Sequence, residues 1–211
     1  MVSFNYIGPI NHTGYGIASA SYFSALYSLG IKIGYRPVGN IDYNVLNEVG
    51  LTKDHITKSH SAFDPSNPTF VFWHLHDILR FVELYNVSGP KVAFSTFEVD
   101  GFTDKEKTNA AYFDTIATAS TWGTSILKNN FPNVADPIPH AFKATPDHSI
   151  PIFNRANEDI LASWQKLLPF SLDNPLILST SGKYETRKGH PELLSACAEF
   201  SKHRQVILVA S

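Results

Sequence analysis

The sequence is poor in cysteine and carries little net charge. Only one of the 211 residues, Cys197, is a cysteine, so no internal disulfide can form. A lone thiol on a predicted helix fits a reducing compartment, and we expect a cytoplasmic protein. The formal net charge of −2 gives no indication of bulk nucleic-acid binding or of a polybasic membrane anchor, and we expect no nucleic-acid partner.

Long apolar runs are also absent. No apolar run approaches the roughly 20 residues of a membrane-spanning helix. The first residues, MVSFNYIGPINHTGYG, lack a basic region followed by an apolar core, so they do not form a signal peptide. These absences predict a soluble chain without a membrane span, and they leave peripheral contact with a membrane surface open.

What the sequence does contain is a regular alternation of apolar strand patterns and amphipathic helix patterns. Strands are predicted over 4–10, 31–38, 69–76, 91–99 and 114–120, and helices over 16–30, 44–50, 77–85, 104–113 and 121–131, the last capped by Thr121. This order predicts an α/β fold, with a Rossmann-like parallel sheet and helices on both faces. Ligands of such sheets bind at the carboxyl ends of the strands.

The alternation is interrupted once, which predicts two domains. We expect a first domain over 1–150, a linker over 151–173 and the start of a second Rossmann-like domain over 174–211. The second part contains a predicted strand, helix and strand at 176–182, 190–202 and 205–210. Two parallel strands cannot cover their own faces, so we expect either a missing C-terminal remainder or a second chain.

The first predicted strand is followed by the loop TGYG, residues 13–16. Gly14 and Gly16 precede a helix, where glycine lets a ligand phosphate approach the backbone. The same residues also suit a tight strand-to-helix turn that binds nothing. The third glycine of a dinucleotide fingerprint is missing, and the second strand does not end in an acidic residue, which weakens a nicotinamide-binding interpretation.

Two later strands end in side chains that suit hydroxyl recognition. In WHLHD, His74 and His76 share one face if the strand continues that far, and either histidine could bond a substrate hydroxyl or be an ordinary surface residue. No third ligand at a usable spacing accompanies them, so we predict no metal site. In STFEVDG, Glu98 and Asp100 offer carboxylates, which could instead serve the following helix.

A basic loop precedes the last predicted helix. Gly182 ends the strand, Lys183, Arg187 and Lys188 follow, and Pro191 suits the first helical turn. Cationic side chains beside free helix amides form an anion site that suits phosphate or diphosphate. The alternative is a solvated surface loop whose charges bind nothing.

These segments, in this order, resemble a GT-B glycosyltransferase of the retaining, nucleotide-sugar-dependent family 4 group. GKYETRKGHPELLSA is the most specific segment, and TASTWGTSIL and IPHAF are similar to two further segments of that family. Gly182 and Lys183 match the family's Gly-Arg step, and Lys188 and Gly189 match its Lys-Gly pair. The matching helix positions are Leu193, Leu194 and Ala196.

The resemblance implies two facing Rossmann-like domains and transfer of a sugar from a UDP- or GDP-linked donor to a hydroxyl acceptor, without a metal or other cofactor. The donor diphosphate would be bound by Gly14, Gly16, Gly182, Lys183, Arg187 and Lys188. His76, or alternatively His74, would act near the donor sugar or the acceptor. The acceptor-side candidates are Tyr15, Glu98 and Trp122.

The chain departs from the family pattern in two ways. Lys183 replaces an arginine, which keeps the charge but loses the bidentate fork. The family's C-terminal carboxylate motif lies beyond residue 211, so we expect the chain alone to be inactive or poorly active. A non-catalytic carbohydrate- or partner-binding module on the same fold, and less favourably a nicotinamide-dependent oxidoreductase, are the alternatives.

Overall fold

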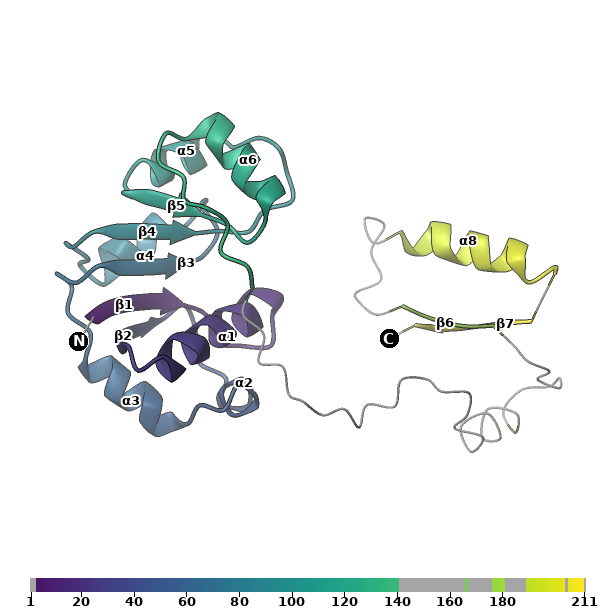
Figure 1. Cartoon of the computed structure of the whole chain (residues 1–211), viewed down its shortest axis with the longest axis horizontal. Helices are drawn as coiled ribbons and strands as arrows, with labels where there is room; N and C mark the ends of the chain where they lie inside the picture. Colours follow the sequence, from purple (N-terminus) through teal and green to yellow (C-terminus); the bar gives the residue numbers. More distant parts are fainter. Residues whose placement is uncertain (1–2, 141–165, 167–175, 181–188, 204, 211) are drawn as a thin grey trace. The chain divides into compact units, whose positions relative to one another are not determined.

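The chain divides into two compact units, Met1–Thr145 and Pro146–Ser211. A computed structural model describes residues 3–140, 166, 176–180, 189–203 and 205–210 (Figure 1). The predicted boundaries near residues 150 and 173 lie outside the described residues.

The first unit alternates strands and helices almost throughout. Its strands are β1 (Ser3–Gly8), β2 (Lys32–Pro37), β3 (Thr69–Phe72), β4 (Lys91–Phe94) and β5 (Thr115–Ala117). Its helices are α1 (Gly14–Ser28), α2 (Tyr43–Glu48), α3 (Lys53–Ser61), α4 (Leu79–Leu84), α5 (Asp104–Ala110) and α6 (Thr121–Asn130). The five strands form one sheet in the order β2-β1-β3-β4-β5, and all four pairings are parallel. The prediction of an α/β fold with a parallel, Rossmann-like sheet is therefore confirmed.

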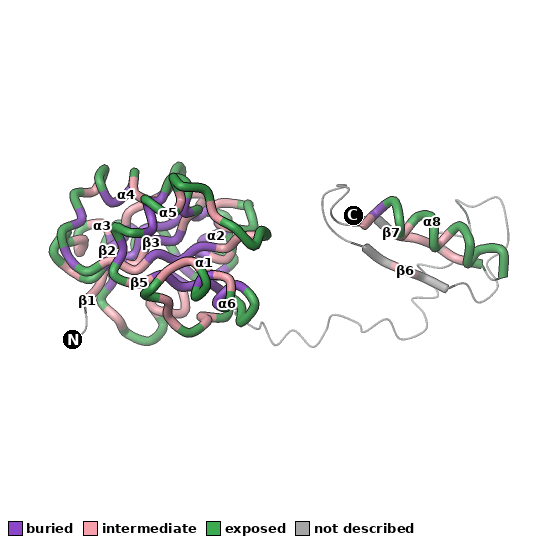
Figure 2. Tube along the Cα trace, turned by 90° about the horizontal axis from the view of Figure 1, so that it is seen from above, coloured by how far each residue is buried: buried purple, intermediate pink, exposed green. Residues whose placement is uncertain are grey.

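One face of the sheet is covered by a core that is rich in aromatic rings. Tyr6, Phe72 and Phe94 project from three neighbouring strands and pack with Tyr22 and Phe23 of α1. The rings of Phe72 and Phe94 stack with centroids 4.8 Å apart. Buried residues follow the strands in Figure 2. The aromatic side chains therefore fix α1 against the sheet and set the position of the loop that precedes it.

The other face is covered by a core that is mainly aliphatic. The strands direct a second set of side chains away from α1: Ile7, Val71, Ala93 and Ile116. These side chains pack with residues of α4, α5 and α6, including Phe81, Val82, Ala110 and Leu127. Successive residues of a strand point to opposite faces. Because both faces are covered, the central strands read as continuous apolar runs rather than as alternating patterns.

Helix α3 was not predicted, because it buries little apolar surface. Only Ile56 and Ser59 of its residues are buried. Its first turn is closed by a histidine in the place usually taken by a glutamate: the amide of Thr52 donates to Nδ1 of His55 at 2.9 Å. A polar helix with an unusual cap carries no clear 3.6-residue pattern, so the sequence gives little indication of it.

The start of helix α6 differs by one residue from the prediction. The side chain of Ser120, not that of Thr121, caps the helix by accepting a hydrogen bond from the amide of Gly123 at 3.0 Å. Both hydroxyl residues suit a cap, and the short strand β5 places Ser120 in the extended conformation that a cap requires.

The outer edge of β5 is covered by the segment that follows α6. The amide of Ile116 donates to the carbonyl of Asn133, and the amide of Ala135 donates back to the carbonyl of Ile116. Farther along, the amide of Ile138 donates to the carbonyl of Thr118 at 2.9 Å. The segment thus runs parallel to β5 and satisfies its outward-facing backbone groups.

The second unit contains β6 (Leu176–Thr180), α8 (His190–Phe200) and β7 (Val206–Ala210) in its described part. The two strands pair in parallel with Leu176 opposite Val206. Gly189 caps α8 with a φ of 69°, a left-handed conformation that favours glycine. Cys197 is half-buried on α8.

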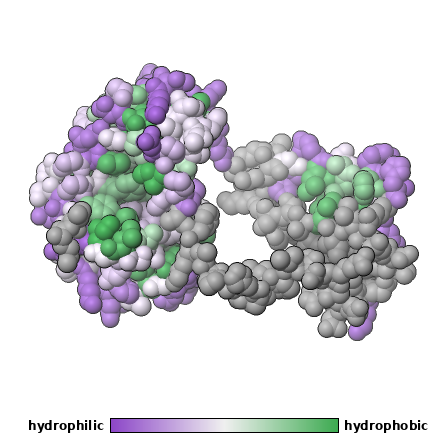
Figure 3. All heavy atoms as spheres, in the orientation of Figure 1, coloured by the Kyte–Doolittle hydropathy of each residue, from purple (hydrophilic) through white to green (hydrophobic). Residues whose placement is uncertain are grey.

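None of the helices in the described ranges is both long and apolar enough to cross a membrane. On the face of the first unit seen in Figure 3, hydrophilic and hydrophobic residues are interspersed.

His60 makes the first unit sensitive to acid. Its ring stacks on Tyr35 with centroids 5.7 Å apart, and its Nε2 atom is buried without a hydrogen-bond partner among the described residues. Burial, and secondarily the charge of Arg36, lowers the pKa of His60. The unfolded chain therefore binds the proton more readily, so this contribution to stability is present above about pH 6.5 and is lost as the pH falls through the lowered pKa.

We expect His60→Phe to reduce this acid sensitivity. Phenylalanine keeps the stack on Tyr35 and removes the unpaired nitrogen. The loss of melting temperature between about pH 7.5 and about pH 5 should shrink by roughly 2–4 °C. Thermal melts at both pH values measure this change, with His203→Phe, at an exposed histidine of the second unit, as the control. An unchanged pH dependence would show that His60 does not carry it.

Candidate functional site

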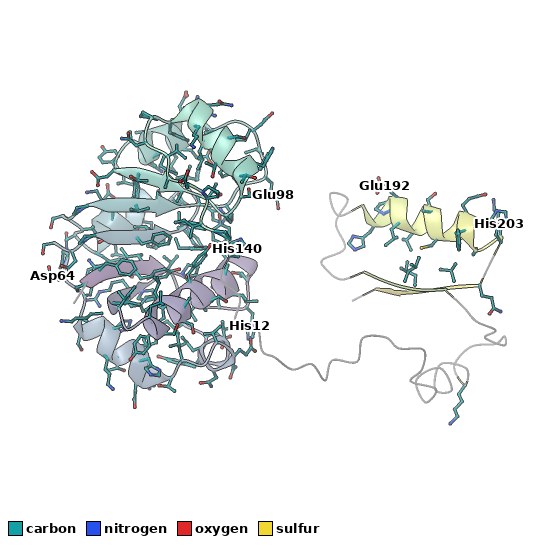
Figure 4. All side chains as sticks on the ribbon, viewed as in Figure 1. His12, Asp64, Glu98, His140, Glu192 and His203 are labelled. Atoms are coloured by element: carbon teal, nitrogen blue, oxygen red, sulfur yellow. The ribbon has the colours of Figure 1, made fainter. Side chains whose placement is uncertain are left out.

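The carboxyl ends of the parallel strands form the edge at which the predicted site residues meet. Figure 4 shows His12, Glu98 and His140 along this side of the first unit, whereas Asp64 lies at the opposite edge. The strand order places β1 between β2 and β3, so β2 is added on one side of β1, and β3, β4 and β5 are added on the other. Ligands of open α/β sheets bind near such a switch point, outside the carboxyl ends of the strands.

Tyr15 covers the ends of β3 and β4. Its ring lies 4.1 Å from the ring of His74 and 5.5 Å from that of Phe72, measured between centroids. Its hydroxyl donates to the carbonyl of Thr96 at 2.6 Å and accepts from the amide of Thr96 at 3.1 Å. Because both backbone groups of Thr96 hold this hydroxyl, the ring rather than the hydroxyl is the part of Tyr15 that can serve a ligand.

A pocket opens beside Tyr15 at the ends of β3 and β4. Its volume of about 530 Å³ lies within the range typical of small-molecule sites. Its lining residues are Tyr15, His74, Leu75, Ser95, Thr96, Phe97, Glu98, Phe102 and Glu106. The sequence-predicted residues Tyr15, His74 and Glu98 are therefore brought together here from the first turn of α1 and from the segments that follow β3 and β4.

His74 is the titratable base of this pocket. Desolvation by burial lowers the pKa of its imidazole, and the nearby carboxylates of Asp77 and Glu106 oppose that shift only in part. The ring is therefore neutral near pH 7. A neutral imidazole has one nitrogen with a free lone pair, which can accept a hydrogen bond from a substrate hydroxyl.

His76 lies apart from His74. The predicted strand over 69–76 is too long, because β3 ends at Phe72 and residues 75–78 form a turn, so the condition for a shared strand face is not met. His76 does not line the pocket, and its Nε2 atom lies 3.1 Å from the ammonium of Lys105. The turn is held by Asn109, whose side-chain amide donates to the carbonyls of Leu75 and His76 at 2.9 and 2.7 Å.

Ser95 lines the same pocket and was missed from the sequence. Its side chain is only 2% exposed, and it follows the last residue of β4. Serine is common at strand ends, so nothing in STFEVDG distinguishes this residue. The carboxylates beside it include Glu106, whose Oε2 accepts from the amide and hydroxyl of Thr103 at 2.8 Å in the capping box of α5.

The two glycines in the first turn of α1 differ in their surroundings. Gly16 is buried, and its amide donates to the hydroxyl of the cap residue Thr13 at 3.1 Å. A Cβ atom at Gly16 would collide with Asn11, whereas a Cβ atom at Gly14 would meet nothing within 4 Å. Gly16 therefore has a packing role, and the backbone at Gly14 is open to approach.

Trp122, the last of the acceptor-side candidates, does not line the pocket. The indole of Trp122, at the start of α6, is half exposed and lies 6.0 Å from the ring of Phe97, one of the pocket residues. Gly182, Lys183, Arg187 and Lys188 lie outside the described residues. Among the residues that are described, no three His, Cys, Asp or Glu side chains are placed to hold a metal ion.

We expect Tyr15→Phe to destabilise the first unit. The substitution keeps the ring on His74 but leaves the backbone amide of Thr96 without its partner, at a cost of about 1–2 kcal/mol. Urea unfolding measures this loss. Tyr112→Phe is the matched control, because that side chain is 57% exposed and should change nothing. Equal stability of the two variants would contradict a structural role for the Tyr15 hydroxyl.

Comparison with known proteins identifies no family: no protein-family model matches the chain, and no curated protein is significantly similar to it.

Proposed function

We propose that the chain belongs to a GT-B glycosyltransferase that transfers a sugar from a nucleotide-sugar donor to a hydroxyl acceptor with retention. In this proposal the first unit binds the acceptor, and the second unit contributes to binding the donor. The observation that carries the proposal is the pocket at the carboxyl edge, where His74, two carboxylates and three aromatic rings line one space.

This combination suits a sugar hydroxyl. Carbohydrates present hydroxyl groups at the ring edge and apolar C–H groups on the ring faces. The carboxylates of Glu98 and Glu106 can accept hydrogen bonds from hydroxyls, and the rings of Phe97 and Phe102, whose centroids are 5.0 Å apart, offer an apolar surface. His74 then accepts the hydrogen bond of the reacting hydroxyl.

The donor side of the proposal depends on the resemblance of GKYETRKGHPELLSA to the family 4 segment. The helix that follows this loop begins with a left-handed Gly189, and Pro191 lies in its first turn. Such a helix start directs backbone amides toward an anion. Lys183 and Lys188 would bind the diphosphate and stabilise the negative charge that develops on the UDP or GDP leaving group. We assign no protein nucleophile.

Calorimetric titration of the 211-residue chain with UDP, GDP, UDP-glucose and GDP-mannose tests the donor side. We expect measurable binding of one nucleotide and a loss of roughly tenfold or more in Lys188→Ala, because a charge-assisted contact to phosphate is removed. Lys202→Ala is the matched control, since Lys202 is an exposed lysine of the same unit that pairs with Glu199.

Three results would weigh against the proposal. Absence of binding to every nucleotide would remove the donor side and favour a carbohydrate-binding module without transfer activity. Equal losses in Lys188→Ala and Lys202→Ala would show that bulk charge, not the loop, binds the nucleotide. Binding of NAD(H) in place of sugar nucleotides would favour the oxidoreductase alternative.

A further inference from the structure

Ser95 gives the pocket a hydroxyl that no described protein group bonds. Its amide donates to the carbonyl of Ala117 at 3.1 Å, but its hydroxyl has no hydrogen bond in the described part of the chain. Buried polar groups are nearly always hydrogen-bonded. Because this side chain is 2% exposed and lines the pocket, a polar group of a bound ligand is the partner that the position suits.

The carboxylates of the pocket favour a cationic partner. The capping box holds Glu106 through its Oε2 atom, and Oε1 has no hydrogen bond to the described residues. Glu98 lines the same space. An ammonium group is compact and carries three donors, so it can bond a carboxylate and a serine hydroxyl together.

The other residues that line the pocket bring no positive charge to it near pH 7. No lysine or arginine occurs among the residues that line the pocket. Lys105, the lysine on the first turn of α5, contacts His76 and lies 3.3 Å from Asp77, both outside the lining. Because His74 is neutral near pH 7, the lining carries a net negative charge.

From this arrangement we propose that the pocket takes an amine-bearing sugar, with its ammonium group against Glu106 and Glu98 and a ring hydroxyl or the amine on Ser95. The inference rests on the proposed function and narrows its acceptor to a cationic polyol. The aromatic rings fit the same ligand, because an ammonium is also attracted to ring faces. Anionic acceptors, such as uronic acids or sugar phosphates, are repelled by the same carboxylates.

NMR titration of the 211-residue chain with D-glucosamine, D-glucose and D-glucuronate near pH 7 tests this inference. At low salt we expect glucosamine to bind about tenfold more tightly than glucose, and glucuronate to bind most weakly, because charge-assisted hydrogen bonds are the stronger ones. The preference should shrink as salt screens the carboxylates.

Three variants locate the effect. Glu106→Gln should remove most of the preference for glucosamine while keeping the fold, because glutamine also completes a capping box. Glu83→Gln, an exposed glutamate of α4 away from the pocket, should keep the preference. Ser95→Ala should weaken glucosamine binding about fivefold with little change in melting temperature, because its hydroxyl has no partner to lose among the described residues.

The outcomes separate this inference from the proposed function. Glucose binding as tightly as glucosamine, or a preference unchanged by Glu106→Gln, would overturn the inference and leave a neutral-sugar acceptor in place. Nucleotide binding without any sugar binding would also overturn it and keep the donor side. Failure of every sugar and every nucleotide to bind would overturn both.

Discussion

Gly16→Ala is expected to destabilise the first unit by about 3 kcal/mol and to lower its melting temperature by roughly 10 °C. A Cβ atom at this position would lie 2.6 Å from the backbone nitrogen of Asn11 and would also overlap the carbonyl and side-chain oxygens of that residue. Backbone atoms cannot rotate away as a flexible side chain can. The loop that joins β1 to α1 must therefore move, together with the cap on Thr13.

Gly14→Ala is the matched control two residues earlier. A Cβ atom there meets nothing within 4 Å, and alanine favours the helix that begins at this residue. We expect a melting temperature that is unchanged or slightly raised. Differential scanning calorimetry of both variants gives the comparison. Equal stability of Gly16→Ala and Gly14→Ala would show that the loop relaxes around the added methyl group.

His74→Ala is expected to weaken sugar binding by roughly 10- to 100-fold, because it removes a hydrogen-bond acceptor and the ring that Tyr15 packs against. NMR titration with D-glucosamine measures the loss. His76→Ala separates the two histidines that the sequence offered, and we expect it to bind sugar normally because His76 does not line the pocket. A larger loss of sugar affinity in His76→Ala than in His74→Ala would show that the sugar binds nearer to Lys105.

The pH dependence of sugar binding gives a second test of His74. Because the pKa of its imidazole is lowered by burial, the ring stays neutral below the ordinary value of about 6.5. Binding should therefore persist at about pH 6.5 and fall as the pH drops through the lowered pKa, where protonation removes the accepting lone pair. His74→Gln, which keeps an acceptor that does not titrate, should lose this part of the pH dependence.

The strands and their order along the chain could be predicted because burial on both faces leaves unmistakable apolar runs. FNYIG, TFVF and KVAF all became strands of one parallel sheet. The carboxyl ends of these strands follow from the parallel arrangement, so Tyr15, His74 and Glu98 could be assigned to one edge in advance. Helix α3 could not be predicted, since it buries only two of its side chains.

The finer details of the site depend on where each strand ends, which the sequence does not specify. TFVFWHLH is apolar enough to extend the strand, yet the ladder stops at Phe72, so His74 and His76 separate. Ser95 becomes notable only because the packing around β4 buries its side chain to 2% exposure without supplying a partner. Neither fact is a property of local sequence, because both depend on how neighbouring loops pack.

The segment that runs along β5 also bears on how copies of the chain behave toward one another. An exposed edge strand is a template on which another chain can add a strand, which leads to aggregation. The hydrogen bonds between Ile116 and the residues Asn133 and Ala135 occupy that template within the first unit. The last hydrogen bond of this covering segment comes from the amide of Ile138. Tyr22 of α1 holds the same place, because its hydroxyl donates to the carbonyls of Ile138 and Pro139. Helix α1 therefore helps to keep this edge closed to self-association.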